Sequence, residues 1–205
     1  MKHICVFDEK GEYKGEGKTH PALATLQSKA ELMGKLTWSI KTYSKHVPNT
    51  KKQEKAIKRA FLRIGLVIPQ KFKFERNNLN ADIVIEFSDD DPYFKQHKSA
   101  LAYAFVGTTS QPIDIVFNDS NFFWAINTDA GPNQYKIEPV AVHEILHVLG
   151  VGHNPTCSQC IMYNSYNKTY SLHDKDIKAV QDIWGKRTGF ARLRMKLWGY
   201  LLREL

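Results

Sequence analysis

Hydrophobic and polar residues alternate along some parts of the chain and recur at helical spacing along others. Residues 36–43 alternate and are rich in β-forming side chains, which predicts a strand. After Pro48, Asn49 and Thr50, apolar residues recur at the spacing of one helix face, which predicts a helix. The apolar positions of this helix are Ala56, Ile57, Ala60, Phe61 and Ile64.

The remaining pattern places more strands in the middle of the chain and two helices late. Short apolar runs predict strands at residues 72–75, 81–87, 101–105 and 113–117. A longer apolar stretch predicts a helix from about Pro139 to Gly150, and Asp174 is suited to N-cap a last helix that ends before Gly185. The apolar residues of that helix are Ile177, Val180, Ile183 and Trp184. This order of elements, around a cleft, predicts an α+β domain.

Within the first of the late helices, residues 143–153 read HEILHVLGVGH. His143 and His147 lie four residues apart, so on a helix they share one face and can hold one metal ion. Gly150 has the backbone freedom needed to end the helix and turn the chain. His153 then returns as a third ligand, and a zinc ion held by three histidines keeps its fourth position open for water and substrate.

Glu144 directly follows the first of these histidines. There its carboxylate would accept a proton from a zinc-bound water. Met162 stands nine residues after His153, at the spacing of a Met-turn beneath such a metal site. The pattern predicts one catalytic zinc ion, with Glu144 as the base. His173 is the one alternative base nearby in the sequence.

Length, composition and charge indicate the class of protein that carries this motif. The 205 residues are enough for one catalytic domain with a short appendage, and a hydrophobic content of 42% is typical of a packed core. The net charge of +8 indicates either a well-solvated basic surface or attraction to an anionic partner. The sequence contains no nucleic-acid-binding motif. We expect a monomer that acts on a peptide or a protein.

Three cysteines are too few for the disulfide framework of a small secreted protein. Cys157 and Cys160 form a C-x-x-C between His153 and Met162. They could be a redox pair, half of a metal site, two unrelated thiols or a local disulfide. Because no second cysteine pair completes a four-cysteine site, we expect no separate zinc there.

The two ends of the chain differ from the middle and suggest three parts. Residues 1–35 are expected to form an extension with a small hairpin, or a pro-segment whose Cys5 caps the zinc. Residues 36–187 are expected to form the catalytic domain. Residues 188–205 form a basic, amphipathic tail that docks on the domain, contacts another protein or lies on a membrane. No segment has the length of a secretory signal or a membrane span. We therefore expect a protein made in soluble form, whose export would take another route or would need a segment missing from this sequence.

On these features the sequence resembles the metzincin clan of zinc proteases, and within it the matrixins, the matrix-metalloproteinase-like family. The resemblance covers roughly residues 35–185 and extends well past the zinc motif. Residues 36–40 are similar to the opening strand of the family and residues 81–87 to its third strand. Residues 160–163 are similar to its Met-turn, and residues 172–185 to its closing helix.

The resemblance implies a fold, an activity and further site residues. The fold would be a twisted, mostly parallel sheet with an antiparallel edge strand, a zinc helix and a C-terminal helix. Residues 113–118 match the edge strand that lines the cleft of this family and pairs with extended substrate. Met162 would lie under the metal, and Tyr166 would wall the primary specificity pocket. The activity would be that of a zinc-dependent endopeptidase that hydrolyses peptide bonds through a zinc-bound water activated by Glu144.

Some positions depart from the family pattern. Tyr103 and Val116 stand where animal matrixins hold a structural zinc, so no second zinc is expected there. Residues 118–121 contain a single carboxylate in place of an acidic calcium cluster, which makes a tight calcium site doubtful. Asn164 stands where astacins carry a tyrosine that can join the zinc. An inhibitory pro-segment and a hemopexin-like repeat are not recognised.

Two other classes of function compete with the endopeptidase. The chain could be a metzincin-like zinc-binding module of a larger assembly, with little or no proteolysis, or a zinc hydrolase of small molecules. Glu144 argues against the first, because a binding module has no physical need for that base. A cleft that binds strands favours peptides over small molecules.

Overall fold

The computed structural model describes residues 21–105, 112–126, 131 and 133–189. The predicted hairpin near the N-terminus, the role suggested for Cys5 and the basic tail from residue 190 onward lie outside these residues. Three expectations about the two ends of the chain are therefore not addressed by the fold.

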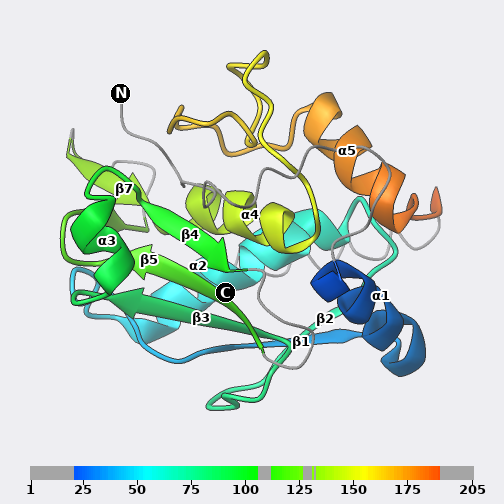
Figure 1. Cartoon of the computed structure of the whole chain (residues 1–205), viewed down its shortest axis with the longest axis horizontal. Coiled ribbons are helices and arrows are strands. Elements are labelled where there is room, and N and C mark those ends of the chain that lie inside the picture. The colour runs from blue at the N-terminus through cyan, green and yellow to red at the C-terminus, as the bar shows by residue number, and fades with distance from the viewer. Residues whose placement is uncertain (1–20, 106–111, 127–130, 132, 190–205) are drawn as a thin grey trace.

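A five-stranded sheet forms the framework of the molecule (Figure 1). Its order is β2-β1-β3-β5-β4. The strands are β1 (Leu36–Ile40), β2 (Phe72–Phe74), β3 (Ile83–Ser88), β4 (Ala102–Phe105) and β5 (Ile113–Asn118). Neighbouring strands run parallel, except that β4 runs antiparallel to β5. The expected α+β fold, with a mostly parallel sheet and one antiparallel edge strand, is confirmed.

The edge strand is not the one that the sequence suggested. Residues 113–118 were expected at the edge, but this strand, β5, pairs with β3 on one side and with β4 on the other. Both of its edges are therefore occupied by other strands. Strand β4 ends the sheet instead, so an extended peptide can add to the sheet only beyond β4 on this side.

Helices α2 (Thr50–Gly65) and α4 (Ile137–Val148) pack against each other and lie behind the sheet in Figure 1. The side chain of Asn49 caps α2 by accepting a hydrogen bond from the Lys52 N–H. The apolar face of α2 meets the sheet where Phe61 stacks on Trp38, with ring centroids 4.5 Å apart. Every residue of α4 is buried. A helix that is apolar on all sides is expected inside a core, and this one carries the zinc motif.

Charged side chains also join α2 to α4. Glu138, in the first turn of α4, accepts hydrogen bonds from Arg59 at 2.7 Å and from Arg63 at 2.6 Å. Glu138 is buried, whereas each arginine is partly exposed. The two ion pairs therefore add polar contacts between α2 and the first turn of α4, the helix that carries the zinc motif.

A helix that the sequence pattern did not predict, α1 (Pro21–Met33), packs against β1. Leu26 and Ala30 are buried in the main core. The Gln27 side chain donates to the Ile183 carbonyl, and Lys29 pairs with Asp82 at 2.9 Å. With so few buried positions, α1 has only a weak helical pattern. The second half of the predicted extension is thus in contact with the domain.

Four further elements complete the described fold. They are α3 (Pro92–Gln96), β6 (Phe123–Ala125), β7 (Gln134–Lys136) and α5 (Asp174–Trp184). The cap of α5 is His173, not Asp174 as expected. The His173 ring accepts from the Lys175 N–H, and the Asp176 carboxylate accepts from the His173 N–H. This reciprocal pair leaves Asp174 in the first turn, where its charge still favours the helix.

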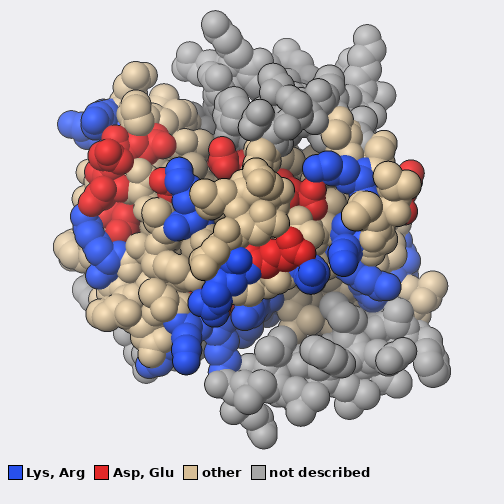
Figure 2. All heavy atoms as spheres, turned by 90° about the horizontal axis from the view of Figure 1, so that it is seen from below, with Lys and Arg blue, Asp and Glu red and all other residues tan. Residues whose placement is uncertain are grey.

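The surface carries the excess of basic residues in the sequence. On the face in Figure 2, Lys and Arg side chains lie between smaller groups of Asp and Glu. The Lys41–Glu86 ion pair joins the end of β1 to β3, whereas Lys73–Glu75 lies along β2 and the residue that follows it. Among the described helices, none is long and apolar enough to cross a membrane.

Candidate metal centre

The three histidines of the motif converge on one point. His143 and His147 come from α4, and their Nε2 atoms lie 3.0 Å apart. After the helix, Gly150 adopts a φ of 89°, which turns the chain back toward α4. The Nε2 atom of His153 then lies 3.2 Å from each of the other two.

Two backbone carbonyls fix how the helical histidines point. The Nδ1 atom of His143 lies 2.7 Å from the Ile161 carbonyl oxygen, and that of His147 lies 2.8 Å from the Val151 oxygen. Because a carbonyl only accepts hydrogen bonds, each Nδ1 must donate its proton. Each Nε2 then keeps its lone pair and directs it toward the common point. Hydrogen bonds of this kind orient metal-ligating histidines.

The geometry fits a zinc ion. A tetrahedral zinc with Zn–N bonds of about 2.0–2.1 Å holds its nitrogen ligands about 3.3 Å apart. The three Nε2 separations of 3.0 to 3.2 Å are close to that value. Burial lowers the pKa of His143 to about 3 and lowers the pKa of His147 far below its ordinary value. Both rings are therefore neutral near pH 7, the form that binds a metal.

Glu144 lies fully buried beside these ligands. Neither of its carboxylate oxygens has a hydrogen-bond partner among the described residues. Burial alone raises the pKa of this carboxyl well above its ordinary value. A buried carboxyl without a partner is costly for a fold, and it suggests that a cation, a water or a substrate completes the site.

The loop that carries Met162 is held from α5. The Asp176 carboxylate accepts hydrogen bonds from the Ile161 N–H at 2.9 Å and from the Met162 N–H at 3.2 Å. The carbonyl of the same Ile161 accepts the hydrogen bond from the His143 ring. Met162 itself is buried in the core cluster. Asp176 thus supports the loop beneath the histidines, a role that the sequence pattern gave no sign of.

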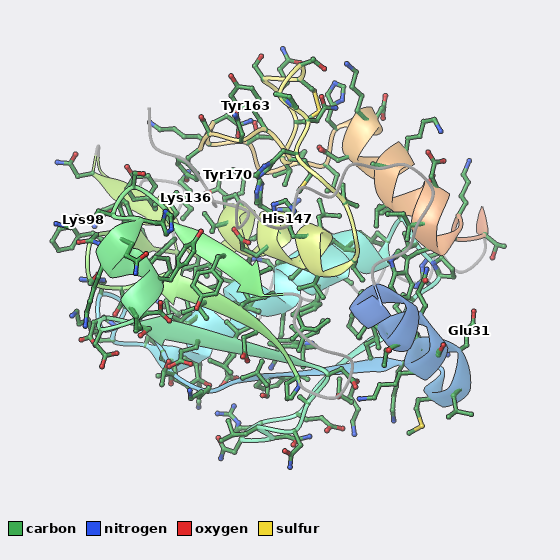
Figure 3. All side chains as sticks on the ribbon, viewed as in Figure 1. Glu31, Lys98, Lys136, His147, Tyr163 and Tyr170 are labelled. Atoms are coloured by element: carbon green, nitrogen blue, oxygen red, sulfur yellow. A yellow bond between two sulfur atoms is a disulfide. The ribbon has the colours of Figure 1, made fainter. Side chains whose placement is uncertain are left out.

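Tyr166 lies at the other side of the same loop, half-buried. Its ring contacts Tyr135 of β7, and its hydroxyl accepts from the Lys136 N–H at 3.3 Å. Burial raises the pKa of Tyr166 to about 12, so the phenol stays neutral. Figure 3 shows Lys136 and Tyr170 above α4, with the Lys136 ammonium 4.4 Å from the centre of the Tyr170 ring.

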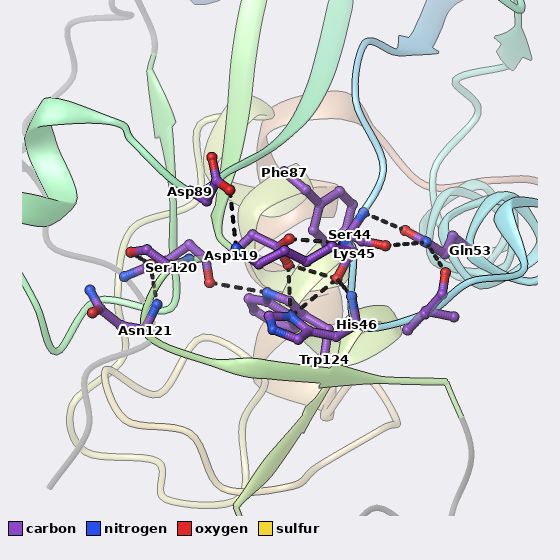
Figure 4. A network of polar contacts seen from close by, with 12 residues as sticks. Ser44, Lys45, His46, Gln53, Phe87, Asp89, Asp119, Ser120, Asn121 and Trp124 are labelled. Atoms are coloured by element: carbon purple, nitrogen blue, oxygen red, sulfur yellow. Dashed lines mark hydrogen bonds and ion pairs between the residues drawn. The ribbon is translucent and has the colours of Figure 1, made fainter.

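The positions at which the family holds other metals have other contacts here. The Tyr103 hydroxyl donates to Asp91 at 3.0 Å, beside the Tyr93 ring. The buried Asp119 accepts from the Ser44 hydroxyl at 2.6 Å, from the Lys45 N–H and from the His46 ring (Figure 4).

These contacts of Asp119 join the segment after β1 to the segment after β5, which are far apart in the sequence. The Asp119 carboxylate, the one acidic group of residues 118–121, is therefore engaged within the protein. The sequence left the state of Cys157 and Cys160 open. In the structure these two cysteines form a disulfide.

The chain is similar to a known protein family and to individual proteins of several organisms. The model of a peptidase family described as Matrixin matches residues 28–185. Matrilysin of Rattus norvegicus is 31% identical over 160 residues, which cover 74% of this chain and 57% of the relative. Metalloendoproteinase 5-MMP of Arabidopsis thaliana is 30% identical over 151 residues, 66% of this chain and 40% of the relative.

A third similar protein is stromelysin-3 of Homo sapiens, at 35% identity over 112 residues, 52% of this chain and 22% of the relative. The chain thus spans between about a fifth and somewhat more than half of the length of these three relatives. The matched region contains the three histidines, Glu144 and the loop through Tyr166.

Proposed function

The chain belongs to the matrixin family, and from this membership we propose that it is a zinc-dependent endopeptidase. The observation that carries the proposal is the convergence of three imidazoles beside a buried carboxyl that has no hydrogen-bond partner among the described residues. We assign the zinc to His143, His147 and His153. We assign the general base to Glu144.

Each residue has a distinct part in the proposed reaction. When bound, zinc supplies a Lewis acid that polarises the scissile carbonyl and acidifies the attacking water. Glu144 accepts the proton of that water and passes it to the leaving amine. Met162 packs beneath the ligands without binding the metal. The buried surroundings of Glu144 strengthen each charge interaction in the site.

Strand β4 is proposed to bind the substrate backbone. The Asn118 N–H donates to the Leu101 carbonyl at 2.9 Å, which marks a hydrogen-bonded pair of the β4–β5 ladder. Because such pairs alternate along antiparallel strands, Tyr103 bonds to β5 whereas Ala102 and Ala104 direct their N–H and C=O groups away from it. An extended peptide can pair with these outward groups.

Tyr166 is proposed to wall the pocket for the residue that follows the cut. Its apolar ring and the short loop to Leu172 favour small or medium apolar side chains. Such a pocket discriminates by only about 1–3 kcal/mol per methylene, so the preference is graded. Profiling of cleavage sites in a peptide library tests this assignment, and a dominant charged residue after the cut would contradict it.

The boundaries of the domain are part of the proposal. We propose that residues 36–187 carry the catalysis and that residues 188–205 form an appended contact segment for protein or membrane. The competing function is a zinc-binding module without proteolysis. Glu144 favours the enzyme, because a zinc-binding module has no physical need for a base beside the metal.

A cleavage assay on an unfolded protein substrate separates the two functions. The zinc-loaded protein should cut the substrate, and a chelator should abolish the activity. Glu144→Gln should keep one zinc per chain and lose about 10²–10⁴ in turnover, the usual contribution of a general base. His147→Ala is the matched control, since it should lose the metal together with the activity. Full activity in Glu144→Gln would show that another residue is the general base.

A further inference from the structure

A second group of metal-binding side chains lies outside the histidine site. Cys157, Cys160 and His173 each offer a ligand atom, and the three atoms lie within 4.8 Å of one another. Both cysteines are buried, and His173 is partly exposed. The sequence did not suggest a complete site, because the third ligand comes from the start of α5, thirteen residues after Cys160.

In this structure the two sulfur atoms are joined, with the Cα atoms 5.4 Å apart. A disulfide sulfur is a poor metal ligand, whereas a thiolate is a strong one. The group can therefore act as a metal site only in the reduced protein. Two cysteines separated by two residues have the spacing that zinc sites use for half of their ligands.

The backbone around the cysteines is held by contacts that do not involve sulfur. The Cys157 N–H donates to the Asn154 carbonyl, and the Cys160 N–H donates to the Cys157 carbonyl. The Asn167 amide donates to the carbonyls of Ser158 and Cys160, at 2.9 and 2.7 Å. None of these contacts depends on the S–S bond, so we expect them to hold the loop, and both thiols near His173, when the bond is broken.

The start of α5 also favours two thiolates. A helix N-terminus carries a partial positive charge that stabilises nearby anions. The His173 ring is the N-cap of α5, and it accepts from the Lys175 N–H at 3.2 Å. Binding of a metal by this ring competes with that hydrogen bond. The second half of the capping box, in which Asp176 accepts from the His173 N–H, remains in place.

We propose that reduction of the Cys157–Cys160 disulfide opens a second metal site, with two thiolates and the His173 imidazole as ligands for zinc. In the opening step a dithiol gives two electrons and two protons to the disulfide and becomes a disulfide itself. The S–S bond breaks and two thiols form. Zinc then displaces the two thiol protons, and the resulting Cys₂His site has no net charge. This inference does not rest on the proposed peptidase activity.

Cobalt binding tests the site directly, because cobalt with sulfur ligands has a charge-transfer absorption that histidine ligands lack. The protein carries Cys5→Ser, so that Cys157 and Cys160 are the remaining thiols. It is loaded with one zinc per chain in the oxidised state, reduced anaerobically with a phosphine, and titrated with Co²⁺. The reduced protein should bind one further Co²⁺ with the sulfur band. The oxidised protein should show no such band.

Two variants identify the ligands. Cys157→Ser should lose the sulfur band and the second Co²⁺ under reducing conditions. His173→Asn keeps an N-cap side chain, because Asn caps helices well, but removes the imidazole. It should bind the second Co²⁺ measurably more weakly than the parent protein while its helix content stays unchanged.

Three results would overturn the proposal. They are reduced protein that takes up no further Co²⁺, a sulfur band that persists in Cys157→Ser, and unchanged cobalt affinity in His173→Asn. Circular dichroism of the reduced, metal-free protein serves as the folding control. If reduction unfolds the protein, the loop contacts do not hold the site, and the proposal also fails.

Discussion

Burial acts on Glu144 and on its histidine neighbours in opposite directions. The loss of water that raises the pKa of the Glu144 carboxyl also lowers the pKa of His143. Each group is therefore favoured in its uncharged form in the metal-free protein. A cation held by the imidazoles would reverse this for the carboxylate alone, because it attracts the negative charge. Metal binding and the protonation of Glu144 are thus linked.

A pH dependence of stability follows for the metal-free protein. The pKa of Glu144 is raised in the fold, so the stability it contributes is present below its ordinary pKa of 4.5 and is lost as the pH rises through the folded value. Glu144→Gln has no such loss. Its stability relative to wild type should therefore grow as the pH rises above 4.5, as measured by urea unfolding of both proteins without metal.

The comparison isolates one group, because every other titrating residue is shared by the two proteins. With zinc bound, the advantage of Glu144→Gln should shrink, since the ion stabilises the carboxylate. A stability difference that stays constant from about pH 4 to pH 8 would show that the carboxyl is not held neutral by burial.

At the residue scale, the sequence predicts those groups whose partners are close in the chain. His143, His147 and His153 fall within eleven residues, so their spacing alone indicates that they meet. Asp176 and His173 reach their partners across longer stretches of chain. No local sequence pattern predicts which loop the Asp176 carboxylate contacts. That His173 lies close to Cys157 and Cys160 is likewise seen only in the folded structure.

At the scale of elements, alternation of side chains predicts that a strand forms but not where it lies in the sheet. Strand β5 is apolar and was placed at the edge, whereas it is central. Strand β4, with Ala102 and Ala104, is short and was predicted as a strand without a place in the sheet. Burial on both faces of β5 is in fact typical of a central strand. The cap of α5 differs from the predicted one by a single residue.

The role of β4 leads to a prediction about substrate binding. Ala104→Pro removes an N–H that is directed away from β5, and proline is tolerated at such edge positions. Loss of one hydrogen bond to substrate, worth about 0.5–1.5 kcal/mol, should lower kcat/KM about 2- to 12-fold. The urea midpoint should change little. Ala104→Val retains the N–H and is the control.

Kinetics with a long peptide and with a short one sharpen this comparison. The loss in Ala104→Pro should be clear for the long peptide, which reaches along β4, and small for the short one. Equal losses for both peptides, or an equal loss in Ala104→Val, would show that the β4 edge does not pair with substrate.

At the scale of the whole molecule, the packing of α1 determines how far the folded domain extends toward the N-terminus. The sequence separates residues 1–35 from the domain, and the family model begins at residue 28, inside α1. Leu26 is 4% exposed against the core, whereas Leu32 on the same helix is 85% exposed. Contacts with β1 and with the end of α5 therefore bring the helix into the packed body. Its sequence alone shows little of this, because the apolar residues are not confined to one face: Leu26 and Ala30 are buried, whereas Leu32 and Met33 are exposed.

Leu26→Ala should destabilise the protein by about 2–4 kcal/mol, because it removes buried methyl groups and leaves a cavity. Leu32→Ala should change the free energy of unfolding by less than about 0.5 kcal/mol. Chemical unfolding of the two variants in parallel measures the difference. Equal effects would show that α1 is not packed on the domain in solution.

The close spacing of the three imidazoles also has a consequence for the unfolded chain. His153 lies only ten positions after His143, and closing a loop of about that length costs little entropy and takes about 10–100 ns. If the three histidines bind zinc as proposed, the denatured chain would also bind the ion through the same side chains. Zinc would then stabilise the fold only by the difference between its affinity for the folded chain and its affinity for the unfolded chain. The carbonyl of Ile161, which orients His143 from eighteen residues away, exists as a partner in the native state alone. We therefore expect contacts like this one to contribute to that difference.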